Sequence, residues 1–247
     1  MIMKKLKILS TQISEITIKD LSNLLLTKTA LNIAVCNANS LVRAKKNIVI
    51  QEALNNFDVC TPDGFPVAMA SRILYKNKQE RVDGYKIFNQ TLRDSEFKNK
   101  SHYLFGNTPE VCELIIKKYK NYSKNVNIIG YYCPPFEDYK TLAEDEYIKE
   151  IIELKPDIIW VSLGFPKQEL FIEEIRSKYS FKSNLVGVGF TFDWTAGTKA
   201  KAPEWLANLG FEWLLRLIQE PKRLFKRYMI DNTLFVFYFL KQYMLKN

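Results

Sequence analysis

Short apolar runs of strand length alternate with helical patterns at least five times along this chain of 247 residues. The strand-like runs include residues 31–36, 158–163 and 185–189, and a polar loop and a helical pattern follow each of the first two. Such alternation predicts parallel strands, because a parallel pair needs a long crossover that a helix commonly fills. We therefore expect an α/β fold with a Rossmann-like, doubly wound, mostly parallel sheet, whose strand-end loops carry the functional site.

The composition excludes several other classes of protein. Apolar residues make up 47% and charged residues 26% of the chain, which is typical of a folded globular protein. No apolar run approaches the ~20 residues that a membrane span needs, and no signal peptide is recognisable at the N-terminus. The four cysteines form no Cys-x-x-Cys pair, which argues against a structural zinc site and a disulfide framework. We expect the protein to remain in the cytosol.

Three predicted strand-end loops hold side chains suited to chemistry. The first contains Asn37 and Asn39, the second Asp63, and the third Lys167-Gln168-Glu169, while Arg81 follows the helix after Asp63. Because the carboxyl ends of parallel strands meet at one edge of a sheet, we expect these groups to converge. They suit a sugar linked to a phosphate, since amides bind hydroxyls, arginine neutralises phosphate and an acid removes a proton.

Each of these features also has a structural interpretation. Residues 60–66 fit an ordinary turn, in which Pro, Asp and Gly are favoured. Asp193, after the last strand, fits a functional acid or a helix-capping acid equally well. The only histidine, His102, has no partner for a metal pair or a triad, which favours a structural role. No common phosphate loop and no Asp-x-Asp pair occurs, so we expect neither a metal nor a cofactor.

The C-terminal part of the chain is basic and aromatic. Residues 216–247 hold seven Lys or Arg and two acids, so they carry +5 of the net charge of +9. Arg216, Arg223 and Arg227 fall on one helical face, and the aromatic run 234–240 is too short to span a bilayer. This pattern predicts a segment that lies in an anionic membrane interface. A terminal helix packed on the core, with a solvated basic edge, is the alternative.

Several motifs follow one another between about residue 31 and residue 228. Together, in this order, they resemble the WecG/TagA/CpsF glycosyltransferases, also called glycosyltransferase family 26. The motifs are Thr61-Pro62-Asp63-Gly64, Arg81-Val82-x-Gly84, Gly164-x-Pro166-Lys167-Gln168-Glu169, Gly187-Val188-Gly189 through Phe192-Asp193, Ala202-Pro203-x-Trp205, Glu212-Trp213-Leu214-x-Arg216-Leu217 and Glu220-Pro221-x-Arg223.

The resemblance implies an inverting, metal-independent enzyme of the fold type called GT-E. Such an enzyme moves an N-acetylmannosamine-type sugar or a related hexose from a UDP-sugar to a sugar hydroxyl carried on undecaprenyl diphosphate. The polymer is a cell-surface polysaccharide such as teichoic acid, capsule, exopolysaccharide or an enterobacterial common antigen-like chain. The implied location is peripheral, on the inner face of the plasma membrane. We expect an α/β catalytic domain over residues 1–197 and a helical, membrane-docking appendage over residues 198–247.

The resemblance also assigns roles to particular residues. Asp63 matches the general base, Arg81, Arg216 and Arg223 match cations that meet the diphosphate, and Lys226 extends that cluster. Asn37 stands where the family commonly has threonine, so an amide replaces a hydroxyl at this position. The remaining expected substrate contacts are Asn39, Thr61, Lys167, Gln168, Glu169 and Asp193.

Two other functions remain open on the sequence alone. One is a non-catalytic basic module that binds anionic lipid or nucleic acid, although no RRM, helix-turn-helix or zinc-finger spacing is present and we expect no nucleic acid partner. The other is a transferase of the same fold with a soluble acceptor. In either case, an exposed apolar tail favours self-association into homo-oligomers away from the membrane.

Overall fold

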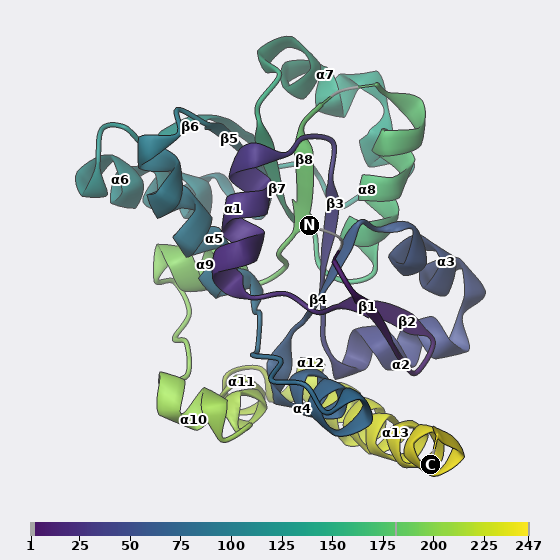
Figure 1. Ribbon diagram of the computed structural model, residues 1–247. Helices are drawn as coiled ribbons and strands as arrows, with labels where there is room; N and C mark the ends of the chain where they lie inside the picture. Colours follow the sequence, from purple (N-terminus) through teal and green to yellow (C-terminus); the bar gives the residue numbers. More distant parts are fainter. Residues whose placement is uncertain (1–2, 181, 247) are drawn as a thin grey trace.

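A six-stranded sheet lies at the centre of the computed structural model, which describes residues 3–180 and 182–246 (Figure 1). The strand order is β4-β3-β8-β7-β5-β6, and every neighbouring pair is parallel, which confirms the predicted fold class. The strands are β3 (Asn32–Cys36), β4 (Val59–Pro62), β5 (Ser101–Gly106), β6 (Asn127–Tyr132), β7 (Ile158–Ser162) and β8 (Asn184–Gly187).

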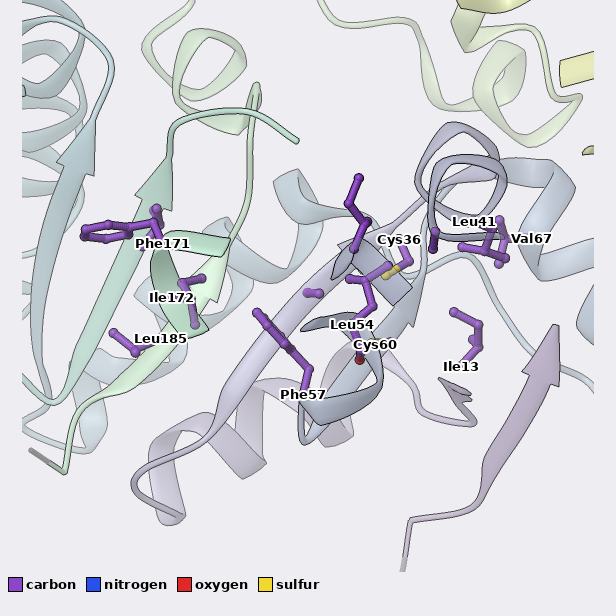
Figure 2. Packing of buried hydrophobic residues seen from close by; sticks show 14 of the residues in the cluster. Ile13, Cys36, Leu41, Leu54, Phe57, Cys60, Val67, Phe171, Ile172 and Leu185 are labelled. Atoms are coloured by element: carbon purple, nitrogen blue, oxygen red, sulfur yellow. Dashed lines mark hydrogen bonds between the residues drawn. The ribbon is translucent and has the colours of Figure 1, made fainter. Parts of the chain in front are cut away.

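Helices cover both faces of this sheet, and each face has its own cluster of buried apolar side chains. Figure 2 shows part of one cluster, in which Phe171 and Ile172 lie beside Leu185 of β8. The helices on that face are α2 (Ala38–Lys46), α3 (Ile48–Asn56), α7 (Asp145–Leu154) and α8 (Lys167–Lys178). The opposite face carries α1 (Ile18–Thr27), α5 (Gly84–Asp94), α6 (Pro109–Tyr122) and α9 (Thr191–Ala196).

The first helix after β3 begins earlier than the sequence pattern indicates. The position of Ser40 before the apolar pattern 41–54 predicts that it is the N-cap, but Asn37 caps α2, with its Oδ1 accepting from the Ser40 amide at 3.2 Å. Ser40 Oγ in turn accepts from the Asn37 amide at 3.4 Å, which completes a capping box. The apolar pattern from residue 41 to residue 54 indicates one helix, but the structure has two, because Asn47 caps α3. Asn37 is thereby held at the carboxyl end of β3.

The N-terminal residues form a separate hairpin rather than an edge strand of the main sheet. β1 (Lys5–Ile8) pairs antiparallel with β2 (Thr11–Ser14), a strand that the sequence did not reveal. Ser14 Oγ accepts from the Cys60 amide of β4 at 3.2 Å. Because β4 is the outermost strand on that side, this bond pairs a donor that the sheet leaves unused.

The acidic helix before β7 is shorter than expected. Acidic residues and isoleucines between about residue 138 and residue 154 indicate one helix, whereas α7 begins at Asp145. Asp138 instead closes a short turn, because its Oδ1 accepts from the amides of Lys140 and Thr141 at 2.8 and 3.2 Å. A 3₁₀ turn, η2 (Thr141–Ala143), follows, and another, η1 (Ser95–Phe97), extends α5.

Residues 204–246 form a string of short helices beside α4 (Gly64–Tyr75), with the longest, α13, ending near the label C (Figure 1). Gly210, with φ at 86°, separates the first two of them. A side chain at Gly210 would meet Phe65, since its Cβ would lie 3.0 Å from the Phe65 ring. The helices are α10 (Glu204–Asn208), α11 (Glu212–Gln219), α12 (Pro221–Arg227), the π-helix η3 (Tyr228–Asn232) and α13 (Thr233–Lys246). We call residues 198–247 the appendage.

Helix α13 has two different faces. Phe235 is buried, and Tyr238 and Phe239 pack against the core cluster. The Gln242 amide accepts from the Leu9 amide at 2.7 Å and donates to the Lys7 carbonyl at 2.8 Å, which fastens α13 to the N-terminal hairpin.

The outward face of α13 is apolar and exposed, and it includes Val236, Phe237, Leu240 and Met244. The structure therefore combines the packed terminal helix of the alternative interpretation with an apolar surface suited to an interface. Within residues 3–180 and 182–246, no helix is long and apolar enough to cross a membrane.

Candidate active site

Two neighbouring cavities lie at the carboxyl edge of the sheet. The strand-end cavity encloses about 840 Å³ of space open to solvent over the ends of β3, β7 and β8, where it is lined by Gln168, Gly189 and Trp194 among others. The appendage cavity encloses about 630 Å³ between the start of α4 and the C-terminal helices, with Phe65 and Trp213 in its wall. Asn37, Asp63 and Arg216 line both cavities, and we call these three residues the shared wall.

Asp63 occupies the N-cap position of α4, directly after β4. Its backbone amide donates to the Cys36 carbonyl at 2.9 Å, which fixes the residue against β3. In the described part of the chain, its side chain makes no capping hydrogen bond to the first amides of α4. The following Gly64 has φ at 76°, a value that favours glycine. The carboxylate is thus held in place by the backbone and remains available to both cavities.

Burial raises the pKa of Asp63 to about 7, and the negative charges of Asp83 and Glu212 act in the same direction. The positive charges of Arg81 and Arg216 lower the pKa, but they do not offset the other effects. A carboxyl group that titrates near neutral pH can both accept a proton and release it under physiological conditions. That is the property that a general base requires.

Arg216 brings a cation to the shared wall from α11. Its guanidinium lies over the rings of Phe190 and Trp194, with 4.9 and 5.4 Å to the ring centroids. Cation–π contacts of this kind hold the guanidinium plane without consuming its hydrogen-bond donors. Arg216 therefore stands beside Asp63 with donors that an anion entering either cavity can meet.

Arg81 lies in the wall of the appendage cavity and is engaged by two carboxylates. Its Nη1 donates to Glu212 Oε2 at 2.7 Å, and its Nη2 lies 3.0 Å from Asp83 Oδ2. The side chains of Arg81 and Asp83 are only 9% and 3% exposed, and that of Glu212 is 20% exposed. Asp83 also caps α5 by accepting from the Lys86 amide at 2.9 Å.

Gln168 lines the strand-end cavity with an amide that is fixed at both ends. Its Oε1 accepts from the Gly189 amide at 3.0 Å, and its Nε2 donates to Glu169 Oε1 at 2.9 Å. Gly187 makes room for it, since a Cβ there would lie 2.9 Å from Nε2. Glu169 is buried behind Gln168 and lines neither cavity, and burial raises its pKa to about 7.

Asn39 lines the appendage cavity, where its Nδ2 donates to Asp231 of η3, so it joins the sheet edge to the appendage. Thr61 is fully buried instead, and its hydroxyl donates to the Val82 carbonyl at 2.9 Å. Thr61 lines neither cavity.

Four further predicted residues lie apart from both cavities or outside the described side chains. Lys167 sits over the Phe136 ring at 4.9 Å, Asp193 accepts from Asn107 Nδ2 at 2.8 Å, and Lys226 is exposed on α12. None of these three lines either cavity. The backbone of Arg223 belongs to α12, but its side chain lies outside what the structure describes.

His102 has the structural role that the sequence favoured. It is buried within the sheet, its Nδ1 accepts from Trp160 Nε1 at 3.1 Å, and burial lowers its pKa to about 3. The imidazole is therefore neutral near pH 7 and lines neither cavity. Within the described part of the chain, no three His, Cys, Asp or Glu side chains are grouped as metal ligands would be.

Several residues of the site had no role assigned from the sequence. Glu212 and Trp213 were visible only as members of a motif, and Phe190 and Trp194 only as aromatic residues after the last strand. Their partners lie far away in the chain, as with Arg81 and Glu212, which are 131 residues apart. The one available signal was the i, i+4 spacing of Glu212 and Arg216 on a single helix.

Comparisons with known proteins identify the family of this chain. A family model described as the glycosyl transferase WecG/TagA/CpsF family matches residues 6–247. The chain is similar to an N-acetylglucosaminyldiphosphoundecaprenol N-acetyl-beta-D-mannosaminyltransferase of Bacillus subtilis (strain 168), with 33% identity over 172 residues. That match covers 70% of this chain and 65% of the Bacillus protein, a little under two thirds of its length.

Two other relatives carry the same name. The protein of Bacillus spizizenii is 30% identical over 180 residues, which are 73% of this chain and 68% of that protein. The protein of Staphylococcus aureus (strain MW2) is 28% identical over 173 residues, which are 70% of this chain and 66% of that protein.

Proposed function

We propose, from the premise that this chain belongs to the WecG/TagA/CpsF family of glycosyltransferases, that it transfers a sugar from a UDP-sugar to a lipid-linked sugar. The names of its relatives support an N-acetylmannosamine-type sugar as the group transferred and N-acetylglucosaminyldiphosphoundecaprenol as the acceptor. The observation that carries the proposal is the shared wall, where Asp63 and Arg216 stand together between two cavities.

The reaction is a direct displacement at the anomeric carbon. Asp63 takes the proton of the acceptor hydroxyl as the hydroxyl oxygen attacks that carbon, and the bond between the carbon and the UDP oxygen breaks with inversion. Arg216 meets the negative charge that develops on the departing diphosphate. General-base assistance of this kind is typically worth about 10²–10⁴ in rate.

We assign the strand-end cavity to the UDP-sugar. It lies outside the carboxyl ends of parallel strands, which is where open α/β sheets bind nucleotides. Gly189, which has no side chain, allows close approach there, and the Gln168 amide retains a second N–H donor for a hydrogen bond. Arg216 reaches this cavity as well, so that the diphosphate can lie beside a cation.

The appendage cavity then receives the acceptor. Phe65, Trp213 and Tyr228 line it and offer apolar surface to sugar rings and to the start of a polyprenyl chain. Because Asp63 lines both cavities, an acceptor hydroxyl on one side can approach a donor sugar on the other.

We propose further that residues 198–247 dock the α/β catalytic domain of residues 1–197 peripherally on the inner face of the plasma membrane. Large apolar side chains are exposed along the described appendage, among them Trp205, Ile218, Phe225, Phe237 and Leu245. Lysines are interspersed with them, at positions 222, 226, 241 and 246. Apolar and cationic side chains on one segment favour an anionic lipid surface.

The test is the release of UDP from a panel of UDP-sugars, with and without a lipid-linked N-acetylglucosamine diphosphate acceptor. The native chain should release UDP only when the acceptor is present, and EDTA should not prevent this release. Asp63→Asn should nearly eliminate it. Asp193→Asn is the matched control, because Asp193 lines neither cavity. Release that survives Asp63→Asn but not Asp193→Asn would assign the base to Asp193. If a soluble acceptor supports release and the lipid-linked acceptor does not, the proposal of a lipid-linked acceptor is wrong.

A further inference from the structure

We propose that Arg81 is a positioning residue, which holds α11 against the catalytic domain through Glu212 and so places Arg216 at the shared wall. The family resemblance implies that Arg81 meets the diphosphate directly. The contacts of Arg81 in this structure support a role through Glu212 instead.

The guanidinium of Arg81 already has two carboxylate partners. Glu212 of the appendage accepts from Nη1 at 2.7 Å, and Asp83, which caps α5, lies 3.0 Å from Nη2. The Nε and Nη2 atoms are buried and make no hydrogen bond to any described residue. Because both nitrogens are buried, a diphosphate in the appendage cavity has little access to them in this arrangement. Two carboxylates of the protein already hold the Arg81 guanidinium, whereas Arg216 keeps donors that a ligand in either cavity can meet.

Glu212 and Arg216 lie one helical turn apart on α11, so they share a face of that helix. The ion pair between Arg81 and Glu212 therefore fixes the position of α11 along its axis and its rotation. The position of Arg216 in the shared wall follows from these two. None of the eight residues of α11 is buried, so packing in the core does not fix this helix. An ion pair in a water-poor site is directional as well as strong, which suits it to this task.

A second ion pair joins the same two parts of the chain and offers a control. Lys86 Nζ, from α5, pairs with Glu204 of α10, but these side chains are 29% and 64% exposed. Exposed pairs contribute little, because water and salt screen them. Removing the exposed pair should leave α11 in place, whereas removing the buried one should release it.

The experiment compares hydrogen exchange of the α11 amides in the full chain with Arg81→Gln, with Glu212→Gln and with both changes. Each single change removes the ion pair between Glu212 and Arg81, whose side chain is only 9% exposed, so exchange in α11 should accelerate roughly 30-fold or more. The double variant should exchange no faster than either single variant, because both changes remove the same contact. Lys86→Gln should leave the exchange in α11 unchanged. The β7 amides, measured in the same samples, show whether the sheet remains folded.

UDP affinity separates the two roles of Arg81, and this readout rests on the proposed function. If Arg81 acts through Glu212, both single variants weaken UDP binding by a similar factor. If Arg81 binds the diphosphate itself, Arg81→Gln weakens binding, while Glu212→Gln, which frees the guanidinium, leaves binding unchanged or tighter. That result, or unaltered exchange in α11 of both single variants, overturns the proposal. Absence of UDP binding in the native chain would contradict the proposed function, and exchange in α11 would still decide on Arg81.

Discussion

The sheet edge and the appendage each supply one charged group to the shared wall, but they hold it differently. Asp63 follows β4, whose four residues are all buried, and its amide is bonded to β3. Arg216 comes from α11, which has no buried residue. The proposed base is thus fixed by the core, whereas the proposed phosphate-binding cation depends on a lightly packed helix. The comparison indicates that docking of the appendage, rather than folding of the sheet, decides whether the site is complete.

Removal of the appendage tests this difference most severely. A chain ending at Gly197 should lose all acceptor-dependent UDP release and all binding to anionic liposomes, since it lacks Arg216 and the apolar surface. Circular dichroism should still show cooperative unfolding, because the shortened chain keeps every buried residue of the two apolar clusters except Phe235. Full activity of the shortened chain would remove the appendage from the mechanism.

Asp63→Asn tests the fixed half of the site. The substitution should lower kcat/KM about 10²–10⁴-fold, the usual worth of a general base. In the native chain, kcat/KM should rise with pH through about 7, because burial raises the pKa of Asp63 to that value and only the ionised form accepts a proton. The residual activity of Asp63→Asn should lack this rise. A rise that persisted would have to come from another group, such as Glu169.

Arg216→Gln tests the docked half. It should weaken UDP binding roughly 10- to 100-fold, the range for losing hydrogen bonds from a charged group. Titration calorimetry would measure the change, with Lys226→Gln as the control because Lys226 is exposed and lines neither cavity. Equal losses in the two variants would indicate a diffuse effect of charge instead of a contact.

The outward face of α13 should contribute to the membrane affinity of the appendage. Phe237→Ser should weaken co-sedimentation with anionic liposomes roughly 10-fold, because an apolar ring no longer enters the lipid. Phe97→Ser is the matched control, since Phe97 is 82% exposed but belongs to η1, outside the appendage. If the two variants bind equally well, α13 is not the docking face.

The smallest effect concerns stability. The folded state holds the pKa of Asp63 above that of an unfolded carboxyl, so ionisation of Asp63 disfavours folding as the pH rises through about 7. At pH 8, Asp63→Asn should raise Tm by roughly 2–4 °C for each kcal/mol removed. Below about pH 4 the gain should vanish, because Asp63 is then protonated in both states. A lower Tm at pH 8 would contradict this view of the site.

Local signals predicted the sheet and its edge. The apolar runs 31–36, 158–163 and 185–189 correspond to β3, β7 and β8, and Thr108-Pro109 is a local signal for the start of α6. The convergence of Asn37, Asp63 and Gln168 followed from parallel topology alone. These features depend on neighbours in sequence or on a general rule of folding, so one chain was enough to predict them.

Contacts between distant segments could not be predicted in the same way. Asn39 pairs with Asp231 across 192 residues, and nothing near either residue indicates the other. The two faces of α13 were also hidden, because the run 234–240 is apolar on all sides and only the packed structure separates a buried Phe235 from an exposed Phe237. The site was thus predictable where the sheet builds it and unpredictable where the appendage completes it.

The shared wall also has a consequence for inhibitor design. Two ligands that occupy the strand-end and appendage cavities lie on either side of the same three residues. If a short tether past Asp63 joins a uridine nucleotide to a sugar mimic, the second half binds at an effective concentration on the order of millimolar. A linked compound of this kind would combine two weak fragments into one tight inhibitor, and its best tether length would measure the separation of the two substrates.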